Sequence, residues 1–337
     1  PTFSEDDRYA VISQALTIRA LAYFDLLRHW GEHDDPGSQF GVPLIIESLG
    51  GDLSNLAFLP RSTVAQVYER IELDLLEAIP NLDDNGDSGI ATLGLAHGLL
   101  ARMYLYRGDY TDAANYATLV IDNPNYALEA NYTDIFDNDG TDESIFELEF
   151  NINDQSDFSN FLLRRNEVLV EPSLVEYFYP SADGIFGPAG PDLRGSLIAF
   201  SRNAPRIFKY DDRSNSTDPA YVRRLAEMYL IRAEALALGA NDPSLGLPDL
   251  NVIRLRDGLA DITTDAGYTL NDFITDLLEE RKHEFYAEGH RFSDLVRLGR
   301  LGDVGITDGF RKVFPIPLFE LQIPGNQIQQ FPGYAEN

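Results

Sequence analysis

Apolar residues recur every three to four positions along most of this chain, which is the spacing of an amphipathic helix. The spacing predicts helices over residues 9–30, 64–79, 94–107, 109–121, 220–238, 247–256 and 270–289. Ser62 or Thr63 can cap the second of these helices, and Gly108-Asp109 separates the third from the fourth. The pattern therefore predicts a mainly α-helical protein.

One octet occurs twice in these helices. LARMYLYR, beginning at Leu100, and LAEMYLIR, beginning at Leu225, share six of eight residues across an offset of 125. RALAYFDL, beginning at Arg19, repeats the Ala-x-x-Tyr core of the octet. A small residue one turn before a tyrosine lets a neighbouring helix approach closely. Together with Ala113 and Ala117, these copies predict a tetratricopeptide-like helical-repeat superhelix, a scaffold that binds more often than it catalyses.

The helical period is lost between residues 125 and 218. SIFELEF, starting at Ser144, alternates like a short strand, and clusters of Gly, Pro and Asp follow it with many aromatic residues interleaved. A final segment over residues 314–334 holds four prolines and should lie extended. We expect one domain over 1–337, made of N-terminal helices (1–124), a loop-rich insertion (125–218) and C-terminal helices with an extended tail (219–337).

Charge and composition exclude several classes of function. The 55 acidic and 26 basic residues leave a formal charge of −29, which repels nucleic acid and anionic membrane surfaces. Cysteine is absent, so disulfides, thiolate metal sites and a cysteine nucleophile are excluded. The chain starts at Pro1 without a signal peptide or an apolar run of membrane-spanning length. We expect any export signal or lipid anchor to lie upstream of this sequence.

No cofactor or metal site is expected. His29 and His33 have an i, i+4 spacing, but the second lies beyond Gly31 and no HExxH motif accompanies them. Two acidic clusters have the alternate-residue spacing of calcium ligands: Asp83, Asn85 and Asp87, and Asp137, Asp139 and Asp142. Neither continues into a twelve-residue loop with its closing glutamate, so solvated acidic turns are the better interpretation.

The densest charged segment runs from Glu279 to Arg300. Glu280, Glu284 and Glu288 could supply a pair of carboxylates for general acid and base catalysis on a glycosidic bond. Interleaved arginines hold carboxylates ionised, which suits an ion-pair network better than proton donation. We therefore predict a structural network and no catalytic residues; its expected members are Arg281, Glu284, Glu288, Arg291 and Asp294.

Several segments together resemble one family, the SusD/RagB outer-membrane lipoproteins. These segments are ALTIRALAYFDLLRHWG followed by GVPLI, RSTVAQVYERIELDLLEAI, RLAEMYLIRAEAL, LNVIRLRDGL, ERKHEFYAEGHRFSDLVRLGR and FPIPLFELQIPGNQIQQFPGY. They span nearly the whole chain in the order of the family. EGHRFSDLVR combined with the FPIP and PGY ending is the specific part of the match.

The resemblance implies a surface-exposed lipoprotein of the outer membrane that captures oligosaccharide and delivers it to a SusC-like TonB-dependent transporter. The anchor is not in this sequence, and membrane contact is expected only through it. Peptide capture of the RagB type is the alternative from the same resemblance, and a helical glycoside hydrolase is the alternative from another class.

The expected ligand site combines aromatic platforms with polar partners. Trp30 is the only tryptophan and lies at a predicted helix end beside a polar loop. Aromatic residues near Pro and Gly in the insertion should be exposed and could stack on sugar faces, and Asp192 and Arg194 could bind hydroxyl groups. The predicted ligand-binding residues are Trp30, Tyr177, Tyr179, Phe186, Asp192 and Arg194.

Overall fold

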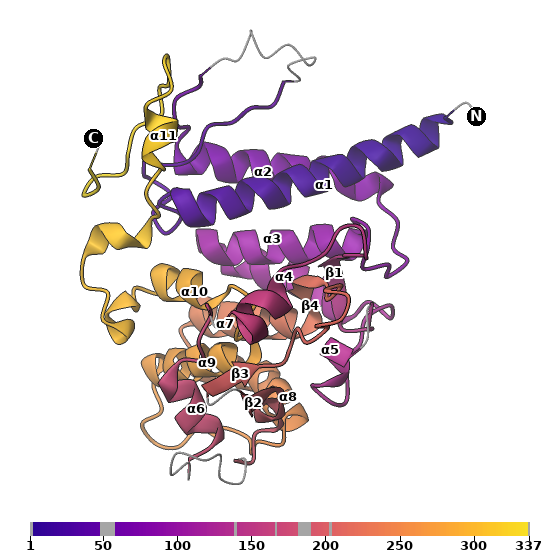
Figure 1. Cartoon of the computed structure of the whole chain (residues 1–337), viewed down its shortest axis with the longest axis vertical. Helices are drawn as coiled ribbons and strands as arrows, with labels where there is room; N and C mark the ends of the chain where they lie inside the picture. The colour runs from indigo at the N-terminus through magenta and orange to yellow at the C-terminus, as the bar shows by residue number, and fades with distance from the viewer. Residues whose placement is uncertain are drawn as a thin grey trace. The chain divides into compact units, whose positions relative to one another are not determined.

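The protein is mainly α-helical, as the sequence predicts. The computed structural model describes residues 3–47, 58–137, 140–165, 167–180, 190–201 and 204–335. Its helices are α1 (Glu5–Trp30), α2 (Val64–Ala78), α3 (Leu93–Arg107), α4 (Tyr110–Ile121), α5 (Asp134–Asp137), α6 (Pro172–Phe178), α7 (Leu225–Ala240), α8 (Leu247–Arg256), α9 (Leu270–Glu284), α10 (Arg291–Arg297) and α11 (Leu318–Leu321) (Figure 1). All seven helices expected from the apolar spacing are present, but α9 ends at Glu284, five residues before the predicted end at residue 289.

Strands are short and pair in two separate ladders. β1 (Ser144–Leu148) pairs antiparallel with β4 (Ala220–Arg224), and β2 (Ile198–Ser201) pairs antiparallel with β3 (Ala204–Ile207). The prediction that the α7 helix begins at residue 220 is wrong. Residues 220–224 are extended and pair with β1, and the helix begins at Leu225. The tail is extended as expected except for the single turn of α11.

The chain forms two compact units. The first unit holds residues 1–82, 102–109 and 292–337. In it α1 packs along α2, and a capping box at Thr63 begins α2 where the sequence predicted it. Arg19 and Arg70 both pair with the buried carboxylate of Asp74, at 2.6 and 2.5 Å. The Ala20 and Tyr23 positions of the repeat are buried in this unit.

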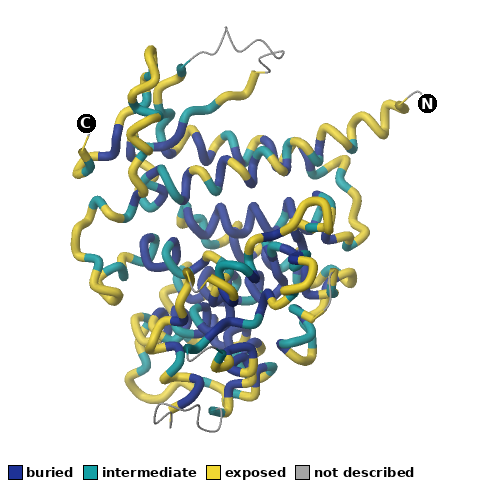
Figure 2. Tube along the Cα trace, in the orientation of Figure 1, coloured by how far each residue is buried: buried dark blue, intermediate teal, exposed yellow. Residues whose placement is uncertain are grey.

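By length and composition, α1 could cross a membrane. The sequence, in which no apolar run of that length was found, did not predict this. An 18-residue window of this helix has a mean hydropathy of 1.3, and 33% of the window is buried inside the fold. Its first turns are exposed (Figure 2). In this structure the buried residues of α1, among them Phe24 and Leu27, lie in the hydrophobic core.

The second unit, residues 83–101 and 110–291, contains a helical layer built on small residues. α4 packs along α7, and α7 also contacts α8 and α9. Ala113 and Ala117 on α4 and Ala233 and Ala237 on α7 are fully buried, and a Cβ at Gly239 would lie 3.1 Å from the Cβ of Tyr110. Small side chains therefore allow the close helix approach that the repeat predicted.

The insertion forms a hydrophobic core together with Tyr221 and Tyr286 of the second unit. Aromatic residues provide much of it, including Phe178, Tyr179, Tyr210 and Tyr221. The remaining members are Tyr132, Ile135, Leu162, Leu163, Val170, Leu174, Leu197, Ile198, Ile207 and Tyr286. The insertion is thus irregular in backbone but densely packed, because large rings fill the space between short elements.

A buried group of charged side chains joins the insertion to the helices of this unit. We call it the ion network, and it consists of Arg194, Lys209, Arg224, Arg254, Arg256, Glu143, Asp192, Asp257, Glu280, Glu284 and Glu288. Glu284 is at its centre, within 3.3 Å of Arg194, 2.8 Å of Arg224 and 2.5 Å of Arg256. Burial opposes ionisation of Glu284, but these arginines outweigh it and hold its pKa well below the ordinary value.

The membership of the ion network corrects part of the sequence prediction. Glu284 and Glu288 belong to it, and Glu280 does as well. Arg291 instead pairs with Glu279, and their side chains are 31% and 45% exposed. Arg281 lies beside His290, while Asp294 pairs with Arg297 in the first unit. Spacing along the segment identified acidic members of the network, whereas all five of its cations come from earlier parts of the chain, two of them from the insertion.

One carboxylate of the ion network has a pKa near neutral pH. Burial, and then the nearby charge of Glu284, raise the pKa of Asp257 to about 7, although Arg194 and Arg256 act in the opposite direction. The network has six carboxylates for five cations, so a proton on Asp257 brings its net charge to zero. The free-energy cost of burying the network is therefore lowest just below neutral pH, where its net charge is zero.

We predict that Arg224→Met destabilises the protein strongly. The substitution leaves Glu143, Glu284 and Glu288 without their shared partner, which should cost about 3–5 kcal/mol of unfolding free energy. The matched control is Arg291→Met, which removes a half-exposed pair and should cost less than about 1 kcal/mol beyond its lost packing. Urea unfolding followed by circular dichroism measures both, and equal losses would contradict this account of the ion network.

We also predict a pH dependence that Asp257 controls. Because its folded pKa lies above its unfolded value of 3.8, the wild-type unfolding free energy should fall as pH rises from about 4 to about 7. The slope from this one group is at most about 1.4 kcal/mol per pH unit. Asp257→Asn should be less stable at acidic pH, because an amide replaces an acceptor of Arg256, but its stability should fall less steeply over this window. Parallel curves for the two proteins would show that Asp257 does not titrate there.

Candidate functional site

The C-terminal end of α6 presents a tyrosine ring with defined support on one face. Glu171 caps this helix by accepting from the backbone N–H of Leu174, and Pro172 occupies its first turn. Tyr177 lies near its end and is 38% exposed. Its ring stacks on His283 of α9, with a centroid distance of 3.6 Å and an interplanar angle of 12°. We call the Tyr177 ring and its His283 support the Tyr177 platform.

Hydrogen bonds fix the orientation of this platform. The Tyr177 hydroxyl donates to Oδ2 of Asp192 at 3.0 Å, and Asp192 accepts two further bonds from the Arg194 guanidinium, at 2.7 and 2.9 Å. Burial raises the pKa of Tyr177, and the charge of Asp192 adds to this effect, so the hydroxyl stays a donor. The ring is therefore held by its edge as well as by one face, and among the described residues no second ring stacks on its other face.

His283 is buried and uncharged. Burial is the main cause, and Arg194 and Lys282 add to it, so that the pKa of His283 falls to about 2. Within the described part of the chain its Nε2 atom has no hydrogen-bond partner, and it lies 3.8 Å from Glu279. A neutral imidazole stacked on a phenol is a flat, rigid support and contributes no charge to a ligand above it.

The other predicted insertion residues do not form an open site. Tyr179 is 8% exposed, and its hydroxyl donates to the carbonyls of Gly195 and Ile198, so the expectation that it is exposed is wrong. Asp192 and Arg194 are 3% and 0% exposed because they bond to each other and to the ion network. The prediction of exposure relied on nearby Pro and Gly residues. These residues indicate turns in the chain, and the residues next to a turn can pack into a core as readily as they can be exposed to solvent. Phe186 lies outside the described residues.

Trp30 is in the first unit, at the last residue of α1. Arg61 donates to its carbonyl at 2.7 Å, and its ring lies 5.6 Å from that of His29. Phe314 also contacts the His29 ring and is 40% exposed. Trp30 itself is half-buried at this helix end.

The glutamates considered for catalysis are occupied. The side chains of Glu280, Glu284 and Glu288 are each at most 1% exposed, and each accepts from at least two cationic side chains. A general acid must be protonated at working pH and must reach the substrate, and burial among arginines opposes both requirements. The arrangement suits a structural role, but the cations that pair with these glutamates are not the arginines interleaved with them in the sequence.

The candidate metal residues hold backbone or other protein groups. His29 Nδ1 lies 2.7 Å from the carbonyl of Asp25, and His33 is buried with its pKa lowered to about 3, by burial first and then by Arg28. Asn85 and Asp87 accept from backbone N–H groups two residues ahead. Asp139 lies outside the described residues. Among residues that are described, no group of three His, Asp or Glu side chains is placed to hold a metal ion.

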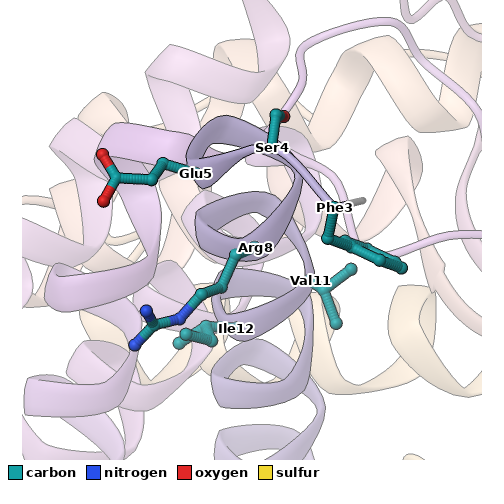
Figure 3. A pocket seen from close by; sticks show the side chains of 6 residues that line it. All are labelled: Phe3, Ser4, Glu5, Arg8, Val11 and Ile12. Carbon is teal, nitrogen blue, oxygen red and sulfur yellow. The ribbon is translucent and has the colours of Figure 1, made fainter. Parts of the chain in front are cut away.

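The first turns of α1 line an open hollow of about 430 Å³. Phe3, Ser4, Glu5, Arg8, Val11 and Ile12 surround it, all from one continuous segment (Figure 3). It contains apolar surface but lacks convergent polar groups from other described elements, which a specific ligand pocket needs.

Comparisons with known proteins agree with this architecture. A family model described as "SusD family" matches residues 203–334, and one described as "Starch-binding associating with outer membrane" matches residues 2–105. A SusD-like protein of Bacteroides ovatus is 27% identical over 87% of this chain, which spans 60% of that relative's length. SusD-like protein P2 of Formosa agariphila is 26% identical over 96% of this chain and 74% of its own.

Solved structures extend the match to the whole fold. A laminarin-binding SusD-like protein superposes with a TM-score of 0.77 at 26% identity, covering 98% of this chain and 80% of its own. A SusD superfamily protein from Bacteroides vulgatus gives 0.80 at 28% identity, covering 99% and 80%. The family models match both ends of the chain, and the structural likeness spans the insertion between them: this chain belongs to the SusD/RagB family.

Proposed function

We propose that this protein captures oligosaccharide at the cell surface and delivers it, without chemical turnover, to a TonB-dependent transporter of the outer membrane. Membership of the SusD/RagB family supports the role in glycan uptake, and the description of the matching N-terminal family model supports association with the outer membrane. The laminarin-binding relative supports a carbohydrate ligand. A lipid anchor and the transporter partner are proposed from the family alone.

The observation that carries the proposal is the Tyr177 platform. A sugar ring presents axial C–H groups on one face, and these pack well against a flat π surface. Tyr177 offers such a surface already fixed by His283 and Asp192, so little side-chain entropy is lost when a ligand stacks on it. Exposed Ser173 and Glu176 on the same helix can bind hydroxyl groups around its edge.

Trp30 is proposed as a separate contact, within the first unit. This half-buried residue at the end of α1, beside the His29 ring, could stack on a sugar. Of the predicted ligand residues, we retain Tyr177 and Trp30 as direct contacts. Asp192 and Arg194 are proposed to position Tyr177 from behind, and Tyr179 to support the core under it.

Absence of turnover is proposed from the state of the acidic residues. Glu280, Glu284 and Glu288 are buried and paired with cationic side chains, so they are not placed to reach a glycosidic oxygen. Release of reducing sugar from any polysaccharide bound by the purified protein would instead support the glycoside hydrolase alternative.

We predict that Tyr177→Ala weakens binding of the oligosaccharide identified on a glycan array. Loss of one stacking surface should cost about 0.5–1.5 kcal/mol beyond the lost contact area, a decrease in affinity of roughly tenfold in total. Tyr177→Phe keeps the ring on His283 and should retain most of the affinity. Isothermal titration calorimetry compares these variants with Tyr9→Ala, which removes a 48% exposed tyrosine from α1 and should have no effect. Unchanged affinity in Tyr177→Ala would exclude the platform.

Trp30 allows a direct optical test of this separate contact. As the only tryptophan, it reports alone on its surroundings. If a sugar covers its ring, saturating oligosaccharide should change its emission, and Trp30→Phe should weaken binding by less than Tyr177→Ala does, because the phenylalanine keeps part of the surface. A titration that saturates by calorimetry without altering the emission would exclude Trp30 as a sugar contact. Binding only of peptides on the same array format would favour the RagB-type alternative.

A further inference from the structure

We infer that the ligand of the Tyr177 platform is an uncharged glycan, not one that carries sulfate or carboxylate groups. This inference rests on the proposed function, since it names the class of oligosaccharide that the same site accepts. It follows from the state of the cationic side chains around the platform.

Recognition of an anionic sugar needs a cation with unused donors. Arginine forks and lysine ammonium groups bind sulfate and carboxylate through charge-assisted hydrogen bonds. Four cationic side chains act electrostatically on His283, the support of the platform: Arg194, Lys282, Arg291 and Arg254. Each of these is already bound to a carboxylate of the protein.

The two arginines of the ion network are occupied. Arg194 is 0% exposed and bonds Asp192 at 2.7 Å and Glu280 at 2.6 Å. Arg254 bonds the other oxygen of Glu280 and the carbonyl of Ala260, both at 3.1 Å. If either arginine turned to an external anion, a carboxylate buried in the network would lose a partner. Both therefore support the platform and are not donors for a ligand.

Lys282 and Arg291 share one carboxylate. Lys282 Nζ lies 3.1 Å from Glu279 and 3.3 Å from the hydroxyl of Ser173, and Arg291 bonds Glu279 at 3.2 Å and the carbonyl of Leu278 at 2.8 Å. Glu279 thus partly neutralises both of these partly exposed cations. An anionic ligand would have to compete with a carboxylate that is covalently fixed beside them.

The other charged side chains described next to Tyr177 are negative. Glu171 and Glu176 on α6 are exposed, and Asp192 lies directly behind the Tyr177 hydroxyl. His283 is neutral at physiological pH, as its lowered pKa shows. The whole chain also has a formal charge of −29. Both the local and the long-range electrostatic fields therefore disfavour binding of an anionic ligand. Hydroxyl groups, in contrast, are donors and bind well to carboxylates.

The test compares glycans that differ only in charge. Laminarin and starch represent neutral glucans, and chemically sulfated preparations of each keep the same backbone. Alginate is added as a natural carboxylated polysaccharide. Calorimetric titration of the wild-type protein should detect binding of a neutral glucan or of another neutral polysaccharide from the array. Sulfation of that polysaccharide should weaken binding by about tenfold or more. The affinity for the neutral form should change little between about 50 and about 500 mM NaCl, a range over which ionic contacts are screened.

A charge variant provides the positive control. Glu279→Gln releases Lys282 and Arg291, so the ratio of sulfated to neutral affinity should rise by about fivefold or more, the worth of one new charge-assisted bond. Glu69→Gln makes the same change in net charge at an exposed position of α2 and should leave the ratio unchanged.

The outcomes separate the inference from the proposed function. Preference of the wild type for a sulfated or carboxylated glycan, with affinity that falls as salt rises, would overturn the inference and leave glycan capture intact. A Glu279→Gln ratio equal to that of the wild type would overturn the explanation through Lys282 and Arg291. Failure to bind any polysaccharide, charged or neutral, would overturn the proposed function and the inference with it.

Discussion

Glu284 and the three arginines around it are the interaction on which the second unit depends. Arg194 comes from the insertion, Arg224 from the end of β4 and Arg256 from the end of α8, and all three meet on one carboxylate of α9. Four segments far apart in sequence are thus fixed at one point. A buried ion cluster is costly to desolvate, and it persists only when every member is paired, so it specifies one arrangement of these segments.

Aromatic rings surround the ion network and connect it to the insertion core. Lys209 lies 3.9 Å from the centroid of Tyr286 and bonds Glu288 at 2.6 Å. Tyr132 donates its hydroxyl to the carbonyl of Glu284. Both tyrosines belong also to the insertion core, so charge pairing and aromatic packing stabilise the same place. The lowered pKa of Lys209, about 8, is the result of its burial, only partly offset by Glu288.

The ion network extends to the candidate site through two residues. Arg194 orients Asp192, and Asp192 accepts from the hydroxyl of Tyr177. The exposed ring is therefore the last member of a chain of contacts that begins at Glu284. This explains how an insertion with few regular elements can present a rigid surface: Tyr177 lies on the short helix α6, and its side chain is held by groups that cannot move without unpairing buried charges.

The sequence by itself determined the long helices, the cap of α2 and the family. Periodicity located α1 to α4 and α7 to α9, because an amphipathic helix needs only local spacing. The repeated Ala-x-x-Tyr identified close-packed positions that are buried, except for Tyr229, which is half-buried. Sequence spacing also indicated that Glu284 and Glu288 serve structure. Only the tertiary structure decided which arginines pair with these glutamates and that Arg291 pairs outside the ion network. It also decided that residues 220–224 form a strand against β1. Finally, it buried Tyr179, Asp192 and Arg194 and left Tyr177 partly exposed. Burial and pairing depend on residues brought together from distant parts of the chain, and local sequence carries no information on which face of an irregular segment will meet them.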